Sequence, residues 1–318
     1  MASNVKKNLV LVLNNKRYNP QDFIDIGARV ARKASDIEVY AVTAGSPPSI
    51  LESAAWQRPT LTVAFSTGGA FSPVRGPLLI GRRIEKLDQS EALKRAGVSV
   101  PLVQPFEPGM KLHPDLWGDY VLLKPAPLEA SSHGEGIQLF RSSRLEKMTL
   151  ADFPEQHPVH KQQMMVQKFI DTGEYPCKYR ALTLCGEPLY IQHHTLNIAR
   201  PGLGASDDVL AGAIVATGGG ERTYRHLDYP EVLAFAKRMA AVFPDVPLLG
   251  CDVIKDINSG ELYGIEVNPN GNVWHFSSPM WAKRRKLLPE VVKAMHSQYG
   301  AFDVAADALI QATRQRAA

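Results

Sequence analysis

The segment CDVIKDINSGELYGIEVN, residues 251–268, decides how the second half of this chain folds. Two runs that mix apolar and charged residues, 251–256 and 261–267, flank the turn-forming residues NSG at 258–260, and this pattern predicts a β-hairpin. The strands of a hairpin lie side by side, so residues far apart in the segment face one another. The segment therefore predicts antiparallel sheet in this part of the chain.

Three oxygen-bearing side chains converge on the predicted hairpin. Asp252 lies on its first strand, and Glu266 and Asn268 lie on the second, where a spacing of two residues puts both on one face of the sheet. Hard oxygen donors of this kind suit Mg²⁺, which keeps its other positions for water and phosphate oxygens. A second interpretation is that the carboxylates face solvent and that Asn268 only opens the turn that follows.

Upstream of the predicted hairpin, a lysine and a loop of small residues have the features of a phosphate-binding site. An apolar strand ends in Lys124, and the loop SSHGEG at 131–136 follows. Small residues such as Ser131, Ser132 and Gly134 let backbone N–H groups approach phosphate oxygens, while lysine adds compact positive charge. No G-x-x-x-x-G-K-[ST] motif occurs, and the alternative is a plain hairpin loop beside an exposed lysine.

The stretch QKFIDTGE, residues 167–174, predicts a hinge between lobes that binds adenine. Its backbone can pair with the purine edge, and Phe169 or Ile170 can supply apolar contact. Glu174 can accept a hydrogen bond from a ribose hydroxyl. The alternative interpretation is an ordinary connection between two lobes.

Composition narrows the class of protein. The 318 residues are 45% hydrophobic and 21% charged, which predicts several packed cores and excludes general disorder. The 36 basic and 32 acidic residues are spread along the chain, so no basic tail indicates a nucleic-acid partner. The three cysteines lack C-x-x-C spacing, which disfavours a zinc site and fits a reducing cytoplasm. The first apolar run, 9–13, is too short for a signal or membrane segment, so we expect no membrane partner.

The order of elements predicts three lobes. Strands are expected at 9–13, 37–42, 61–65, 120–123, 137–140, 164–169, 179–184 and 189–193, with helices at 20–34, 85–97 and 230–243 and a helical tail from 280. The alternating start predicts a Rossmann-like lobe at 1–84, but it lacks G-x-G-x-x-G after its first strand, so a nucleotide is expected elsewhere. A central lobe at 85–167 and a C-terminal lobe at 168–318 follow.

In their order, these segments resemble the ATP-grasp superfamily, including D-alanine:D-alanine ligase, glutathione synthetase and ribosomal-protein glutamate ligases, over roughly residues 85–275. The resemblance implies an ATP-grasp fold of the α+β and α/β kind, with ATP between two α+β lobes behind the Rossmann-like lobe. It implies that Lys86 and Lys124 contact the phosphates and that Arg180 faces them. The remaining implied residues are Gln167, Lys168, Phe169, Ile170 and Glu174 for the nucleotide, and Asp252, Glu266 and Asn268 for the metal.

The resemblance also implies a reaction. ATP and Mg²⁺, with two ions and with Mn²⁺ able to substitute, would activate a carboxylate as an acyl phosphate, which an amine then attacks to form an amide. The expected substrates are a small carboxylate and an amine, such as amino acids or a peptide, and the resemblance favours a homodimer. The alternatives are a phosphotransferase that stops after phosphate transfer, a ligase that modifies a peptide or protein, and a silent ATP-binding scaffold.

The glycine-rich stretch 197–225 is expected to hold the substrate carboxylate and to act with the loop 131–136 as a lid. It contains Arg200, Arg222 and Arg225, and the last two are the preferred carboxylate ligands because arginine binds carboxylates bidentately. Trp274 and His275 would then form the opposite wall of the site. The alternative for Trp274 is that it packs at an interface between lobes.

Overall fold

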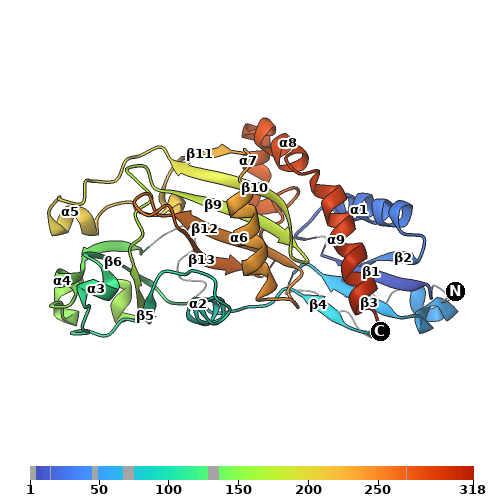
Figure 1. Ribbon diagram of the computed structural model, residues 1–318, viewed down its shortest axis with the longest axis horizontal. Coiled ribbons are helices and arrows are strands. Elements are labelled where there is room, and N and C mark those ends of the chain that lie inside the picture. Colours follow the sequence, from blue (N-terminus) through green and yellow to red (C-terminus); the bar gives the residue numbers. More distant parts are fainter. Residues whose placement is uncertain (1–4, 15, 45–48, 67–74, 128–135, 270) are drawn as a thin grey trace.

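The computed structural model describes the whole chain except residues 1–4, 15, 45–48, 67–74, 128–135 and 270. The described residues form three sheets, arranged in one elongated molecule with the third sheet between the first and the second (Figure 1). The C-terminal residue lies beside the first sheet, where Thr60 N–H donates to the Ala318 carbonyl at 3.1 Å.

The first sheet is parallel and has the strand order β2-β1-β3-β4. Its elements are β1 (Lys7–Leu13), α1 (Pro20–Lys33), β2 (Ile37–Thr43), the 3₁₀ turns Ser49–Glu52 and Ala54–Gln57, β3 (Thr60–Ala64) and β4 (Leu78–Ile80). β1 is an almost unbroken apolar run because a central parallel strand is covered on both faces. α1 begins where the Asn19 side chain accepts a hydrogen bond from Gln21 N–H and Pro20 occupies the first turn.

The second sheet has the order β5-β8-β6-β7, and its strands pair antiparallel. It is built from α2 (Lys86–Arg95), β5 (Val103–Pro105), α3 (Pro114–Trp117), β6 (Tyr120–Pro125), β7 (Gln138–Arg141), α4 (Ser142–Leu145), the 3₁₀ turns Leu150–Asp152 and Pro158–His160, and β8 (Met164–Lys168). A separate apolar core that includes Leu123, Leu145 and Val166 supports it.

The third sheet is antiparallel, with the order β11-β10-β9-β12-β13. Its elements are β9 (Cys177–Leu184), β10 (Glu187–Leu196), α5 (Asp207–Ala211), the 3₁₀ turn Thr217–Gly219, β11 (Arg222–Arg225), α6 (Pro230–Ala241), β12 (Leu248–Lys255) and β13 (Leu262–Asn268). Alternate residues such as Ala181, Ile191 and Val253 pack under Phe235 and its neighbours on α6. The other face of each strand is thereby left to line a cavity.

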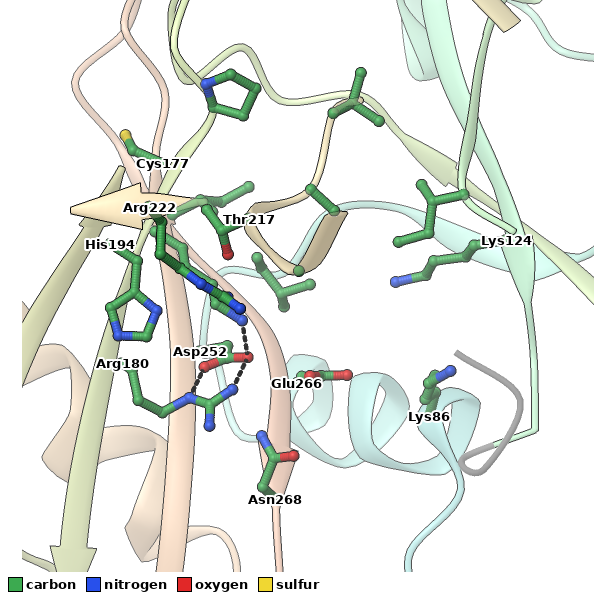
Figure 2. Close-up of a pocket in the computed structure, with 18 of the residues that line it drawn as sticks. Lys86, Lys124, Cys177, Arg180, His194, Thr217, Arg222, Asp252, Glu266 and Asn268 are labelled. Carbon is green, nitrogen blue, oxygen red and sulfur yellow. Dashed lines mark hydrogen bonds and ion pairs between the residues drawn. The ribbon is translucent and has the colours of Figure 1, made fainter. Parts of the chain in front are cut away.

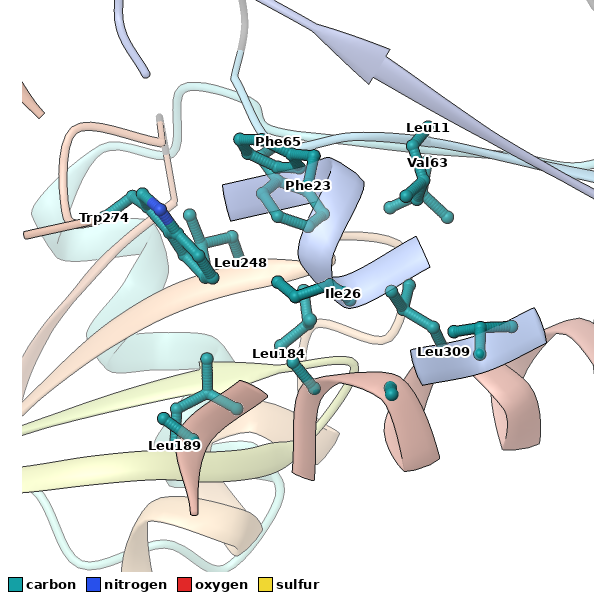
Figure 3. Packing of buried hydrophobic residues seen from close by; sticks show 14 of the residues in the cluster. Leu11, Phe23, Ile26, Val63, Phe65, Leu184, Leu189, Leu248, Trp274 and Leu309 are labelled. Carbon is teal, nitrogen blue, oxygen red and sulfur yellow. The ribbon is translucent and has the colours of Figure 1, made fainter. Parts of the chain in front are cut away.

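The C-terminal helices bring the chain back to its start. They are the 3₁₀ turn Pro279–Trp281, α7 (Ala282–Leu287), α8 (Pro289–Ser297) and α9 (Ala301–Arg316). α9 runs beside α1, and its residue Leu309 joins one apolar core with Ile26 of α1 and Leu184 of β9 (Figure 3). This core joins the first sheet to the third, so the two lobes share one hydrophobic interior.

Trp274 lies in that shared core and does not line the cavity. It is fully buried, its ring lies 5.6 Å from that of Phe23 and 5.5 Å from that of Phe65, and its indole N–H donates to Asp22 at 2.7 Å. Of the two interpretations that the sequence allowed, packing between lobes is the one observed. The expectation that Trp274 forms a wall of the substrate site is wrong, because the indole points back into the first lobe (Figure 3).

We expect Trp274→Ala to lower the free energy of unfolding by about 3–5 kcal/mol, because it opens a large cavity and removes a buried hydrogen bond. Denaturant unfolding followed by circular dichroism measures this change. Trp56→Ala serves as the control because that side chain is only half-buried at the far edge of the first lobe. Equal losses for the two variants would contradict the assignment of Trp274 to the shared core.

The predicted fold class is confirmed, since a parallel α/β lobe precedes two antiparallel α+β sheets. The hairpin at 251–268 is also confirmed, with Asp252 directly opposite Glu266. The short strands β4, β5 and β11 were not predicted, whereas β7, which is equally short, was predicted at 137–140. β11, with the sequence RTYR, has no aliphatic residue that would mark it as a strand. In the described part of the chain, no helix has the length and apolar character needed to cross a membrane.

Candidate active site

A cavity of about 940 Å³ opens among the three sheets. Lys124 enters it from the second sheet, and Arg180 and Glu266 enter it from the third (Figure 2). Gln167 of the second sheet and Arg17 of the first lobe also line it. A volume of this size is sufficient for a nucleotide together with a small second molecule.

The register of the third sheet places four polar side chains in one row. Glu266 lies opposite Asp252, Asp252 opposite Arg180, and Arg180 opposite Gln192, across β13, β12, β9 and β10. Directly opposed residues of an antiparallel sheet point to the same face, which here is the face away from α6. Glu266, Asp252 and Arg180 of this row line the cavity floor, whereas Gln192 is buried and does not line the cavity.

Asp252 is almost completely buried and already has two cationic partners. Its carboxylate accepts hydrogen bonds from the Arg180 guanidinium and from Lys178 Nζ, the latter at 2.7 Å (Figure 2). Burial alone would raise the pKa of Asp252, but Arg180 and Lys178 outweigh it and hold that pKa well below its usual range. Asp252 is thus ionised, and its oxygens are engaged with cations of the chain.

Glu266 and Asn268 present oxygen atoms to the cavity. Asn268 Nδ2 donates to the Gly250 carbonyl at 3.2 Å, which leaves its Oδ1 available to a ligand. Within the described residues, no hydrogen bond or ion pair engages the Glu266 carboxylate, which points across the cavity toward Lys86 (Figure 2). These two oxygen donors fit Mg²⁺, which needs only a few protein ligands, and Asp252 could join them by releasing one of its cations.

Lys86 and Lys124 lie on the opposite wall, and both are buried. Lys86 Nζ donates to the carbonyls of Pro125 and Pro127 at 3.1 Å each, and Lys124 Nζ donates to Gln167 Oε1 at 2.6 Å. Burial lowers the pKa of both lysines, and lowers that of Lys124 to about 8. The neutral amide of Gln167 offsets the positive charge of the buried Lys124 ammonium less than a carboxylate would. This wall of the cavity therefore suits an anionic ligand.

The predicted adenine hinge lines the same cavity, but only in part. Gln167, Phe169 and Ile170 contact the cavity, whereas the side chains of Lys168 and Glu174 do not. Glu174 is exposed, and only its carbonyl has an identified role, accepting from Arg200 N–H at 2.8 Å. The assignment of Glu174 to a ribose hydroxyl therefore lacks support in this arrangement of the chain.

Arg200 supports the hinge. Its guanidinium donates to both oxygens of Asp171 at 2.8 Å and lies over the Phe169 ring, 5.8 Å from the centroid. Arg222 and Arg225 lie on β11, where Arg222 faces the cavity and Arg225 is exposed beside His193 on the other face. The expectation that both are carboxylate ligands is therefore wrong for Arg225, because three residues along a strand reverse the side.

Ser131, Ser132 and Gly134, which were expected to contact phosphate, lie outside the described residues.

Sequence reasoning missed several cationic and aromatic side chains of the cavity. Lys178 and His194 share the polar face of β9 and β10, and period-two alternation with the apolar residues between them is the signal that could have identified both. Burial, together with Lys178 and Arg180, holds the pKa of His194 well below its ordinary value, so its imidazole is neutral. Arg284 comes from α7, far along the chain, and no local pattern connects it to the site. His275, which was expected at the substrate wall, does line the cavity.

No protein-family profile matches this sequence, and no curated protein matches it. Among solved structures, 99% of the chain aligns with 100% of the D-alanine–D-alanine ligase from Bacillus anthracis complexed with ATP, at 12% identity and a TM-score of 0.45. The ATP-grasp ligase PsnB, complexed with precursor peptide PsnA2 and AMPPNP, aligns over 99% of its chain and 94% of this one, at 12% identity and a TM-score of 0.48. The macrocyclase MdnC from Microcystis aeruginosa MRC, bound with precursor peptide MdnA, aligns over 99% of its chain and 96% of this one, at 9% identity and a TM-score of 0.48. The chain is thus similar over nearly its full length to ATP-grasp ligases of known structure.

Proposed function

We propose that this protein is an ATP- and Mg²⁺-dependent ligase that joins a carboxylate to an amine through an acyl phosphate. The observation that carries the proposal is the opposition of two buried lysines, Lys86 and Lys124, to the oxygen donors Glu266 and Asn268 across one cavity (Figure 2). Cations on one wall and metal-binding oxygens on the other match what a transferring phosphoryl group requires.

The nucleotide would lie with its base against the hinge and its phosphates between these walls. Among the described residues, the Ile170 N–H has no hydrogen-bond partner, so it is available to a purine nitrogen. Phe169 is held in place by Arg200 and can supply apolar contact to the base. Glu266 and Asn268 would hold Mg²⁺, which when bound neutralises phosphate charge.

In the proposed reaction, a carboxylate oxygen attacks the γ-phosphorus and ADP leaves with the electrons of the broken P–O bond. The amine nitrogen then attacks the acyl carbon, inorganic phosphate leaves, and the nitrogen loses a proton. Lys86 and Lys124 stabilise the charge on the transferring group, and Arg222 orients the carboxylate. Asp252 keeps Arg180 and Lys178 in position on the cavity floor.

The deciding experiment is a screen for ADP release with pairs of carboxylates and amines, together with mass spectrometry of the product. A condensed product that requires ATP, Mg²⁺ and both substrates supports the proposal. A stable phosphorylated acid that forms without an amine would instead identify a phosphotransferase. Nucleotide binding with no ADP formation in any pair would identify a silent ATP-binding protein.

Arg222 and Arg225 give a test of the substrate wall. We expect Arg222→Ala to raise KM for the carboxylate about tenfold or more, because it removes a charge-assisted hydrogen-bond donor from the cavity. Arg225→Ala should leave KM within about twofold, since this side chain lies on the outer face of β11. Steady-state kinetics at saturating ATP measures both, and equal effects would contradict the assigned faces of the strand.

The lowered pKa of Lys124 predicts an alkaline limit to activity. Its ammonium form predominates below about pH 8, so kcat/KM for ATP should fall as the pH rises through about 8. Gln167→Glu puts a carboxylate beside the ammonium, which raises the pKa and should move this limb to higher pH. A pH–rate profile of the wild-type protein and of Gln167→Glu measures the shift. If the activity of both proteins falls at the same pH, Lys124 is not the titrating group.

A further inference from the structure

The cavity carries more positive charge than a bound nucleotide would neutralise. Counted over the described residues, ten Lys and Arg side chains line it against two carboxylates, those of Asp252 and Glu266. Among the ten, Arg83 is paired with Glu85 and Arg200 with Asp171, both outside the lining, and Arg180 and Lys178 share Asp252. Four carboxylates therefore offset four of the ten cations, and in the described part of the chain Arg222 and Arg284 are among the cations that have no direct carboxylate partner.

Arg222 and Arg284 meet at one aromatic wall in this part of the cavity. Tyr224, two residues after Arg222 on the same face of β11, lies 5.6 Å from the Trp281 ring, and the Arg284 guanidinium carbon lies 5.7 Å from the centroid of that ring. His275 stacks on Trp281 at 4.4 Å and holds the ring in place. The wall therefore brings two guanidinium groups from β11 and α7 to one place.

Among the described residues, neither of these two guanidinium groups has a carboxylate as a direct ion-pair partner. In the described part of the chain, neither the Arg222 nor the Arg284 guanidinium makes a hydrogen bond or an ion pair. Burial, together with the positive charges of Arg284 and Arg180, lowers the pKa of Arg222. The positive charge of Arg284 thus acts on Arg222, and an anion that binds both groups would relieve the repulsion between them.

We infer that the carboxylate substrate is a small acid with a second anionic group, which Arg284 binds while Arg222 orients the reacting carboxylate. This inference rests on the proposed function, because it assigns the substrate of the same cavity. The phosphates of ATP are placed at Lys86 and Lys124, so Arg222 and Arg284 are left for the second molecule. Two guanidinium groups on one wall match two anionic groups on one short backbone.

Three probes of similar length separate the possibilities. Succinate carries two carboxylates, 3-phosphonopropionate carries one carboxylate and one phosphonate, and succinamate replaces one carboxylate by a neutral amide. Isothermal titration calorimetry in the presence of AMPPNP and Mg²⁺ measures their binding without turnover. We expect at least one of the two dianionic probes to bind about tenfold or more tightly than succinamate. Preference for succinate or for 3-phosphonopropionate then tells whether the second group is a carboxylate or a phosphate.

The variants locate this preference at Arg284. Arg284→Gln should reduce the advantage of the dianionic probes over succinamate to about threefold or less, while AMPPNP affinity and thermal unfolding stay unchanged. Lys283→Gln removes the same charge from the exposed neighbouring position and should keep the full advantage. The inference is overturned if neither dianion binds more tightly than succinamate, or if the two variants behave alike. Because no turnover is needed, ADP-forming activity without this preference would refute the inference and leave the proposed function standing.

Discussion

Glu266→Gln is expected to reduce kcat for ADP formation by about 10²–10³, the largest loss predicted for any single residue of this protein. The substitution keeps the side-chain volume and removes the negative charge that would hold Mg²⁺ opposite Lys86 and Lys124. Within the described residues the Glu266 carboxylate makes no hydrogen bond or ion pair, so the fold should be unaffected. Steady-state kinetics over a range of Mg²⁺ concentrations, with circular dichroism to check the fold, measures the effect.

Two further substitutions make this result specific. Glu290→Gln makes the same chemical change on the exposed surface of α8 and should leave kcat unchanged. Asp252→Asn should differ from both, since it leaves Arg180 and Lys178 without their buried counter-ion and lowers the free energy of unfolding by up to about 3 kcal/mol. Near-normal turnover of Glu266→Gln at saturating Mg²⁺ would remove Glu266 from the metal site.

Lys124→Met is expected to lower kcat by about 10² and to weaken ATP binding, because an ammonium in a buried site acts strongly on developing phosphoryl charge. Stability should be kept or should increase, since methionine has a similar length and removes the cost of burying a charge beside Gln167. Single-turnover kinetics and nucleotide titration separate the chemical step from binding, and thermal unfolding reports stability.

Lys86→Met should reproduce the kinetic defect, because Lys86 lines the same wall of the cavity. Lys161→Met removes a lysine from an exposed loop of the central lobe and should have wild-type kinetics. If Lys86→Met and Lys124→Met both retain normal kcat and ATP affinity, the phosphates do not lie at this wall. The proposed position of the nucleotide would then be wrong.

Much of this fold was predicted from the pattern of apolar and polar residues at neighbouring positions. The hairpin at 251–268 was predicted because apolar runs flank a turn of small and polar residues, and its strands β12 and β13 do pair with Asp252 opposite Glu266. Alternation with a period of two also placed Glu266 and Asn268 on one face. β11 was not predicted, because its sequence RTYR contains no aliphatic residue, whereas the equally short β7 contains Leu139.

Side-chain partners depended on pairing between distant segments. Arg222 and Arg225 look equivalent in the sequence, but the pairing of β11 with β10 decides which of them faces the cavity. Asp252 looks like a free metal ligand, but β9 is its neighbouring strand and brings Arg180 and Lys178 into contact with it. The residues near Arg222 and Asp252 in the sequence do not indicate which face Arg222 lies on or which cations contact Asp252.

The sequence by itself determined the fold class and the hairpin at 251–268, because backbone periodicity and turn chemistry act over a few neighbouring residues. Tertiary structure alone decided that Trp274 belongs to the core shared with α1 and that Arg284 joins Arg222 at the cavity wall. Trp274 and α1 are far apart in the sequence, and Arg222 and Arg284 belong to two different elements. Such contacts form only when whole lobes bury apolar surface against each other. The physical reason is the distance along the chain over which the interactions act. Interactions between near neighbours determine which helices and strands form, and packing between distant segments determines which of these elements are in contact.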